Sequence, residues 1–303
     1  MSWYIFAFLS PLLWAISNHI DKYILSRYFR HVNTGVLAIF AGLVGFLFSI
    51  GILIISPQIV GGIDLINAVL IVGNGALLII AFIPYYYALD NEDASSIVPL
   101  YQSIPIFSFI IGFILLKETI SSIQIVAGIF IIIGATLISL DISKTGFRLK
   151  IKVLVLMLIS SFLISIHFLI FKIVAIQENF LRTVFWEYLG ATLVALFLLV
   201  FIRKYRHQFL SAIRNNTKSI IFINVLNETI NIGAKLFANY ASLIAPVVLV
   251  NLANGLQPLF VFIIGLILTI FFPFINKEKI TIHVLVQKII AMIVLFIGTY
   301  LLI

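Results

Sequence analysis

The sequence has few charged residues and no cysteine. Only 10% of its 303 residues are Asp, Glu, Lys or Arg, whereas 63% are apolar and the mean hydropathy is +1.23. A soluble domain carries about 25% charged residues, so this composition excludes a water-exposed globular surface and indicates a chain that folds in lipid. The absence of cysteine excludes disulfides, thiol catalysis and cysteine-ligated metals.

Motifs that are typical of enzymes are also missing. The sequence contains no glycine-rich phosphate loop, no Walker lysine motif, no zinc-spaced histidine pair and no nucleophile elbow. We therefore expect a protein that is not an enzyme and that binds no cofactor and no metal. The net charge of +8 would suggest nucleic acid in a soluble chain, but in a membrane protein basic residues anchor loops. We expect no nucleic-acid partner.

Apolar runs of about twenty residues predict helices that cross a membrane. Strands of a membrane barrel would alternate in polarity over about ten residues, and these runs are continuous. Only a helix satisfies its own backbone hydrogen bonds in hydrocarbon. The predicted helices cover 3–20, 34–56, 66–89, 94–116, 120–140, 153–175, 181–202, 218–240, 243–272 and 281–303.

An internal repeat relates the two halves of the chain. Residues 74–115 align without a gap to residues 227–268, and shared apolar bias does not readily produce matched Asn, Tyr and Pro in one register. The matched pairs include Asn74 and Asn227, Tyr87 and Tyr240, and Pro105 and Pro258. Five helices per half is an odd number, so the second half enters the membrane from the opposite side, as in secondary transporters.

The predicted fold is an all-α integral membrane protein. Ten transmembrane helices form two inverted five-helix repeats around a central cavity. The first repeat covers residues 1–140, a basic linker loop covers 141–152, and the second repeat covers 153–303. A duplication that only enlarged a static bundle is the alternative interpretation.

The chain resembles the drug/metabolite transporter superfamily and, within it, the EamA-type ten-helix transporters. The resemblance extends over essentially the whole chain and implies ten helices in two inverted halves around a cavity, with export or exchange of a small metabolite as the activity. It is carried by Trp14, Lys22, Tyr87-Ala88-Leu89, Ala94-Ser95-Ser96, Pro105, Lys117-Glu118, Gly128 and Gly134, and in the second half by Tyr240-Ala241, Pro258, Glu278 and Gly298.

The basic residues predict an orientation in the membrane. Fourteen of the nineteen fall in predicted loops on one side, two fall on the side that carries both termini, and three fall inside helices. Basic loops stay in the cytoplasm, so we expect both termini outside the cytoplasm of a prokaryotic inner membrane. Members of the family that the chain resembles generally have cytoplasmic termini, so the predicted orientation of this chain differs from theirs.

Five polar residues share one face of the predicted eighth helix. They follow each other at steps of three, one, three and four, which keeps them on one face. Such a polar face does not point toward lipid. It either binds substrate or protons, or it forms hydrogen bonds to other helices. Lys235 has the further alternative of extending its amine to the membrane surface. The five residues are Asn224, Asn227, Glu228, Asn231 and Lys235.

Other ionisable residues fall inside or at the ends of predicted helices. Glu187 is a second buried carboxylate, either in the cavity or paired with Arg182, and it joins Glu228 as a candidate for proton coupling. For the lysines, simple anchoring at the membrane surface is the alternative to a gating role. The predicted coupling and gating residues are Glu187, Glu228, Asp21, Lys22 and Lys172.

Prolines flank polar residues in the predicted fourth and ninth helices. Proline frees backbone carbonyls, which are tolerated in a membrane only where they face protein or water. We expect both helices to be broken or kinked and to line the cavity, or to be kinked only for packing. The predicted substrate-binding residues are Asn74, Tyr101, Gln102, Asn227, Glu228, Asn231, Asn254 and Gln257.

The sequence thus predicts a secondary transporter, an exporter or exchanger of a small metabolite such as an amino acid, amine or nucleobase-like solute, working by alternating access. Its expected partners are the solute and membrane lipid, with proton coupling and a homodimer left open. A flippase for a lipid or lipid-linked substrate is the main alternative. A channel, a sensor or assembly factor, and an enzyme that uses His167 with Glu187 or Glu228 are further alternatives.

Overall fold

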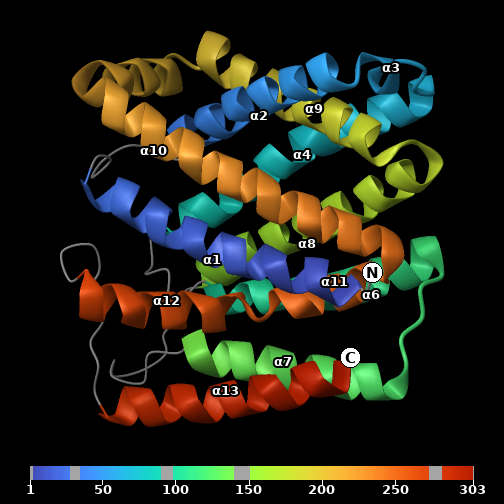
Figure 1. Cartoon of the computed structure of the whole chain (residues 1–303), viewed down its shortest axis with the longest axis vertical. Coiled ribbons are helices and arrows are strands. Elements are labelled where there is room, and N and C mark those ends of the chain that lie inside the picture. The colour runs from blue at the N-terminus through green and yellow to red at the C-terminus, as the bar shows by residue number, and fades with distance from the viewer. Residues whose placement is uncertain (1–2, 28–34, 90–97, 140–150, 273–281, 303) are drawn as a thin grey trace.

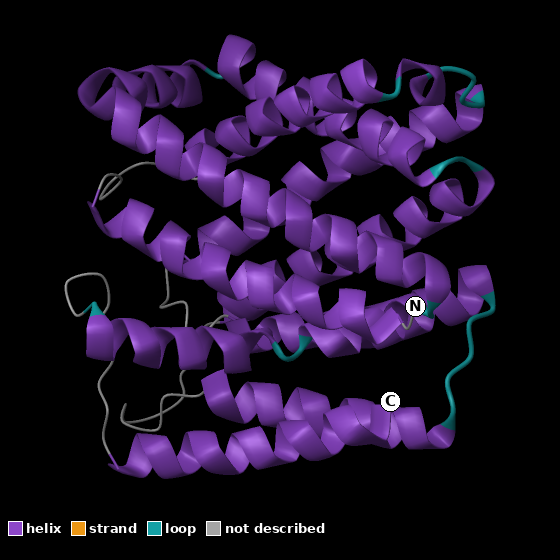
Figure 2. Cartoon of the chain, in the orientation of Figure 1, coloured by secondary structure: helices purple, strands orange, loops and turns teal. Residues whose placement is uncertain are grey.

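The computed structural model describes residues 3–27, 35–89, 98–139, 151–272 and 282–302, and every regular element in these ranges is a helix (Figure 2). The first half contains α1 (Trp3–Arg27), α2 (Gly35–Ile55), α3 (Pro57–Val60), α4 (Leu65–Leu89), the 3₁₀ helix η1 (Val98–Ser103), α6 (Ile104–Leu116) and α7 (Ser122–Ser139). The second half contains α8 (Ile151–Gln177), α9 (Phe180–Phe201), α10 (Arg203–Ile244), α11 (Val247–Asn254), α12 (Gln257–Phe271) and α13 (Ile282–Leu302).

The all-helical prediction is confirmed for the described residues, and each predicted apolar segment coincides with one helix or one helix pair. Five segments are long and apolar enough to cross a membrane by length and composition. They are Val36–Ile55, Leu65–Tyr85, Ile151–Gln177, Phe180–Phe201 and Val247–Phe271. Many large apolar side chains on these helices are exposed, as expected for surfaces that contact lipid.

Residues 203–217 lie between the predicted helices 181–202 and 218–240, where a polar loop is expected. This stretch is helical, so that expectation is wrong. It forms the first turns of α10, which is 42 residues long. The stretch contains no Gly or Pro to end a helix, and Phe209 and Ala212 lie three positions apart and are both buried. Phe209 packs on Phe40 of α2 with ring centroids 4.9 Å apart. Tertiary packing therefore stabilises a helix in a segment whose polarity suggested a loop.

The predicted breaks in the fourth and ninth helices are present. In the first half, η1 ends at Ser103 and α6 begins at the next residue, with Pro105 in its first turn. In the second half, Gly255 and Leu256 separate α11 from α12. Proline cannot donate a backbone hydrogen bond, so each break lies where a proline opens the next helix.

The main helix pairs each join the first half of the chain to the second. α1 packs along α10, α4 packs on α8 and α9, α2 packs on α9, and α7 packs on α13 (Figure 1). The α7–α13 pair forms one edge of the molecule, and α2 with α9 lies toward the opposite edge. The interface between the halves therefore extends across the bundle from one edge to the other.

Two glycines bring α4 and α9 into backbone contact. A Cβ atom at Gly75 would lie 1.9 Å from the carbonyl oxygen of Glu187, and one at Gly190 would lie 2.0 Å from the carbonyl oxygen of Val72. Small residues allow this close approach, which supplies packing energy between helices in lipid. The contact also places Asn74, the neighbour of Gly75, beside Glu187.

We expect Gly190→Ala to destabilise the protein by about 1–3 kcal/mol, because the new methyl group meets a backbone atom that cannot rotate away. Gly73→Ala is the matched control, since a Cβ there meets nothing within 4 Å. Thermal unfolding of the two variants in the same detergent measures the difference. Equal melting temperatures would show that α4 and α9 do not touch as described.

Candidate functional site

Polar side chains gather where α1, α4, α8, α9, α10 and α11 meet inside the bundle. We call this set the polar core. Its members come from both halves of the chain, and most are buried. The polar core consists of Ser10, Ser17, Asp21, Asn74, His167, Glu187, Asn227, Glu228, Asn231, Lys235, Asn251 and Asn254.

One part of the polar core is an ion pair between α9 and α10. The Glu187 side chain has no exposed surface, and its Oε2 lies 2.7 Å from Nζ of Lys235. Asn74 donates to the other carboxylate oxygen at 3.1 Å, and Nε2 of His167 lies 3.6 Å from it. The Lys235 amine also lies 4.4 Å from the centre of the Tyr188 ring, a favourable cation–π position.

These contacts decide two alternatives that the sequence left open. Glu187 pairs with Lys235, and Lys235 does not extend to the membrane surface. Arg182 instead pairs with Glu178 at 2.8 Å in the turn between α8 and α9. The pKa of Glu178 is lowered chiefly by this hydrogen bond from Arg182, then by those from Asn67 and the backbone N–H of Asp64.

A second part of the polar core connects α1 to α10. Asn227 donates to Asp21 at 2.6 Å and accepts from the Ser17 hydroxyl at 2.7 Å. One turn away, Asn231 forms a hydrogen bond with Glu228, and the charge of Asp21 acts on Glu228. The predicted polar face of the eighth helix is therefore shared: Asn227 faces α1, and Lys235 faces α9.

A third part lies at the break between α11 and α12. The Ser10 hydroxyl donates to Asn254 at 2.7 Å, and Asn254 donates to Asn251 at 3.4 Å. Asn251 in turn donates to Ser108 of α6 at 2.7 Å. This chain of hydrogen bonds joins α11 to α1 and α6, so the broken ninth helix is connected to two helices of the first half.

Three predicted binding residues lie beside this chain rather than in it. The Tyr101 hydroxyl lies 3.4 Å from the Ser160 hydroxyl of α8. Gln102 is buried, and its side-chain oxygen lies close to Gly255. Gln257 is half-buried in the first turn of α12. The structure thus brings most of the predicted site residues together and places these three at its border.

Lys172 forms an ion pair at one end of the bundle. Its Nζ lies 2.5 Å from Oε1 of Glu118 and donates to the carbonyl of Ala245 at 2.8 Å. The second oxygen of Glu118 accepts from the backbone N–H of Val247, the first residue of α11, at 3.0 Å. Glu118 therefore connects the end of α6, the end of α8 and the start of α11.

The backbone at the end of α6 places Glu118 at this position. Lys117 ends α6 in the left-handed region with a φ of 53°, and the N–H of Glu118 bonds back to the carbonyl of Gly112. This is a common way to end a helix, although glycine is more usual than lysine there. A Cβ at Gly112 would lie 3.1 Å from Oε2 of Glu118, so the glycine leaves room for the carboxylate.

Some sequence predictions fall outside the described residues. They are the side chain of Lys22, the residue Glu278, and residues 141–150 of the predicted linker loop 141–152. Lys22 belongs to α1 by its backbone.

Sequence reasoning missed several members of the site. Glu118 was noted only as part of a family resemblance, because its partners are distant in sequence. Asn239 is fully buried, and its amide forms no hydrogen bond with the described residues. It follows Lys235 by one helical turn, so extending the polar stripe of the eighth helix by four residues would have found it.

Comparisons with known proteins agree with this picture. Residues 1–140 match the model of the EamA-like transporter family. This part of the chain is therefore similar to the EamA-like transporter family. The EamA-like family is part of the drug/metabolite transporter superfamily, as the sequence predicted, and its members are transporters rather than enzymes. The chain is accordingly a multi-pass integral membrane protein.

The fold of the chain is also found in a solved structure titled "Crystal structure of protein". The similarity covers 99% of this chain and 95% of that chain, with a TM-score of 0.63 and 13% sequence identity. Identity this low shows a shared fold alone. No curated protein matches the chain.

We expect Lys235→Met to destabilise the protein by about 3–5 kcal/mol, because it leaves the Glu187 carboxylate buried without its counter-charge. Adding Glu187→Gln should recover much of the loss, since the neutral amide still accepts from Asn74. Lys117→Met, which removes an exposed amine, is the control. Melting temperatures in detergent measure all three, and an unchanged value for Lys235→Met would contradict the pairing.

Proposed function

We propose that the chain is a secondary transporter that exports or exchanges a small polar metabolite, such as an amino acid, amine or nucleobase-like solute, by alternating access. One observation carries the proposal: charged and amide side chains are collected inside a membrane bundle at the interface between its two halves. Such residues are costly in lipid and mark transport pathways by default. The EamA-like match of the first half supports the same function.

Two equivalent contacts support an inverted repeat. Asn227 of α10 accepts from Ser17 of α1, and the aligned residue Asn74 of α4 donates to the backbone carbonyl of His167 in α8. Each half thus bonds its third long helix to the first long helix of the other half. We propose repeats at 1–140 and 153–303, joined by the linker 141–152. Two such halves can pack in two similar ways, which alternating access requires.

The carboxylates of the polar core are proposed to couple transport to protons. Asp21 and Glu228 act on each other electrostatically, and two ionised carboxylates repel strongly in an interior of low dielectric constant. Binding of a proton or of a cationic solute group relieves this repulsion. Glu187 already has Lys235 as its counter-charge, so Glu228 is our first candidate for the coupling group.

The Glu118–Lys172 ion pair is proposed as a gate. It holds the junction between α10 and α11 against the ends of α6 and α8, and neither side chain is more than 11% exposed. Opening this end requires the carboxylate to release Lys172 or Val247. An ion pair with both partners near the surface can re-form at little cost once it is hydrated.

The orientation of the chain follows from its basic residues. We propose that both termini lie outside the cytoplasm, because fourteen of the nineteen basic residues fall in segments predicted to lie on the other side of the membrane from the termini. The α6–α7 connection, which contains Glu118, lies at the same end as both termini (Figure 1). The ion pair would therefore close the outer end of the pathway.

The purified protein in liposomes should catalyse counterflow of a small solute from a panel of amino acids, amines and nucleobases, and its rate should depend on pH. Glu228→Gln should retain counterflow and lose most of the pH dependence, because the amide cannot exchange a proton. Initial rates across a pH series measure the effect. Glu178→Gln, which changes a carboxylate in the α8–α9 turn, is the control and should keep the native profile.

Two results would count against this function. An identical pH profile in the native chain and in Glu228→Gln would remove Glu228 from coupling. Lipid translocation without flux of any small solute would replace the proposed transporter by a flippase.

The lack of native cysteine allows a test of the gate and of the orientation together. Ser108 is fully buried beneath the ion pair, and Ser121 is exposed just beyond it. A membrane-impermeant maleimide added to intact cells should label Ser121→Cys quickly and Ser108→Cys slowly. Glu118→Gln should speed labelling of Ser108→Cys several-fold, because the amide holds Lys172 less strongly.

Labelling of Ser121→Cys only in broken cells would place both termini in the cytoplasm. If neither Glu118→Gln nor Lys172→Met changes the labelling rate of Ser108→Cys, the ion pair is structural and does not act as a gate.

A further inference from the structure

The first turns of α10, residues 203–214, form an amphipathic helix at the end of the bundle away from both termini (Figure 1). They lie at an angle to the rest of α10 (Figure 1). Phe209 and Ala212 are 6% and 8% exposed and face the protein, where Phe209 contacts Phe40. Tyr205 and Ile213 lie on the same side and pack into the same apolar cluster. This segment is therefore held against the bundle by one face.

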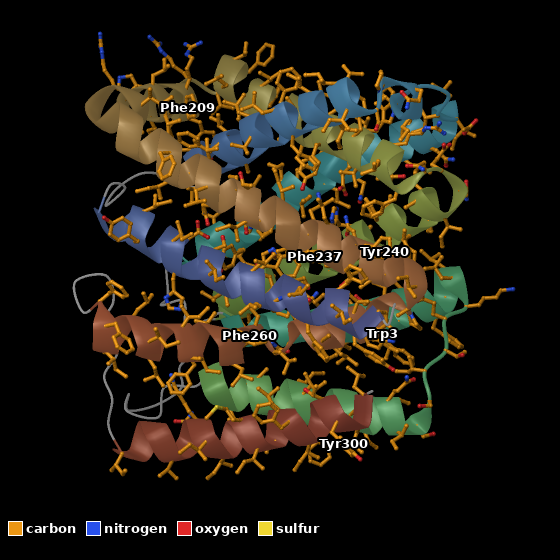
Figure 3. All side chains as sticks on the ribbon, viewed as in Figure 1. Trp3, Phe209, Phe237, Tyr240, Phe260 and Tyr300 are labelled. Atoms are coloured by element: carbon orange, nitrogen blue, oxygen red, sulfur yellow. The ribbon has the colours of Figure 1, made fainter. Side chains whose placement is uncertain are left out.

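The opposite face of the segment is cationic. At 100° per residue, positions 203, 204, 207, 210 and 214 fall about 100° or more from Phe209 around the helix, and position 206 lies on the flank, about 60° from it. The residues 203–214 include no Asp or Glu, and the described residues form no ion pair with the four basic side chains. The exposed basic residues are Arg203, Lys204, Arg206 and Arg214, with His207 beside them. Figure 3 shows nitrogen-tipped side chains that project outward from the turns around Phe209.

The segment lies at the level where the chain leaves the hydrocarbon. Just before it, Val200 and Phe201 at the end of α9 are 54% and 70% exposed, and after it Phe222 is 68% exposed. Apolar surface of this kind faces lipid chains. Leu210, 55% exposed, sits among the basic residues and can reach the edge of the acyl layer. A helix with one cationic face at this depth has the features of an interfacial lipid-binding helix.

We propose that the basic face of α10, formed by Arg203, Lys204, Arg206 and Arg214, binds the headgroups of anionic phospholipids. The four exposed cations have no counter-charge among the described residues, and the lipid surface is a dense source of anions at this depth. Arginine donates to phosphate through two parallel hydrogen bonds, and each basic residue near an anionic leaflet adds to the attraction. The binding site is independent of whether the polar core transports a solute.

Quenching by brominated lipids tests this site in the full-length protein. Leu210→Trp introduces a reporter within the basic face, and the signal of the native residues Trp3, Trp14 and Trp186 is subtracted with the unaltered chain. The reporter should be quenched more strongly by brominated phosphatidylglycerol than by brominated phosphatidylcholine, with a relative binding constant several-fold in favour of the anionic lipid. Neutralising the four basic residues to Gln should bring this ratio close to one.

Controls separate charge from folding. Arg→Lys at positions 203, 206 and 214 keeps the charge and should keep most of the preference, and Lys117→Gln at the other end of the bundle should not change it. In about 0.5 M NaCl, where the Debye length is roughly 4 Å, the unaltered basic face should lose the preference without any loss of fold. Inorganic phosphate at the same ionic strength should have no additional effect if the ligand is a membrane lipid.

Equal quenching by the two lipids around the unaltered basic face would overturn the proposal. So would a preference that survives both the four Gln substitutions and high salt, because the anionic lipid would then be held by other residues. Displacement by inorganic phosphate alone would assign the face to a soluble anion instead.

Discussion

The structure depends on one electrostatic constraint, which is that a charge inside the bundle needs a counter-charge or hydrogen bonds. Glu187 satisfies it through Lys235 and Asn74, and Asp21 satisfies it through Asn227. Removing one partner of such a pair leaves a buried charge and costs more than the pair contributes. These contacts therefore specify which helices meet. The bonds of Asn74 with Glu187 and of Asn227 with Asp21 join the two halves of the chain, and the pair of Glu187 with Lys235 joins α9 to α10.

The apolar residues specify much less. Their side chains are interchangeable in lipid, because packing two apolar helices together removes no apolar surface from water. This explains the roles of Gly75 and Gly190, which allow α4 and α9 to approach until backbone meets backbone. Helix pairing in this protein thus comes from small residues that permit contact and polar residues that select it.

The same distinction explains what could be predicted from the sequence. Helix positions follow from apolar runs of membrane length, and the breaks near Pro105 and Pro258 follow from the chemistry of proline, so both were predicted correctly. The pairings of Glu118 with Lys172 and of Glu187 with Lys235 depend on residues 54 and 48 positions apart. One sequence without an alignment contains no signal for such contacts. The helix at 203–218 was missed because its charges resemble a loop, and the packing of Phe209 on Phe40 appears only in three dimensions.

The backbone of α10 is helical without interruption from Arg203 to Ile244. Its first turns carry the basic face, its middle carries Asn227, Glu228 and Lys235, and its last residues lead to the junction that Lys172 holds. No loop separates these three regions, so one continuous hydrogen-bonded backbone connects the membrane surface to the buried charges. The lipid composition of the surrounding bilayer would then regulate the protein, in addition to the bilayer being its solvent.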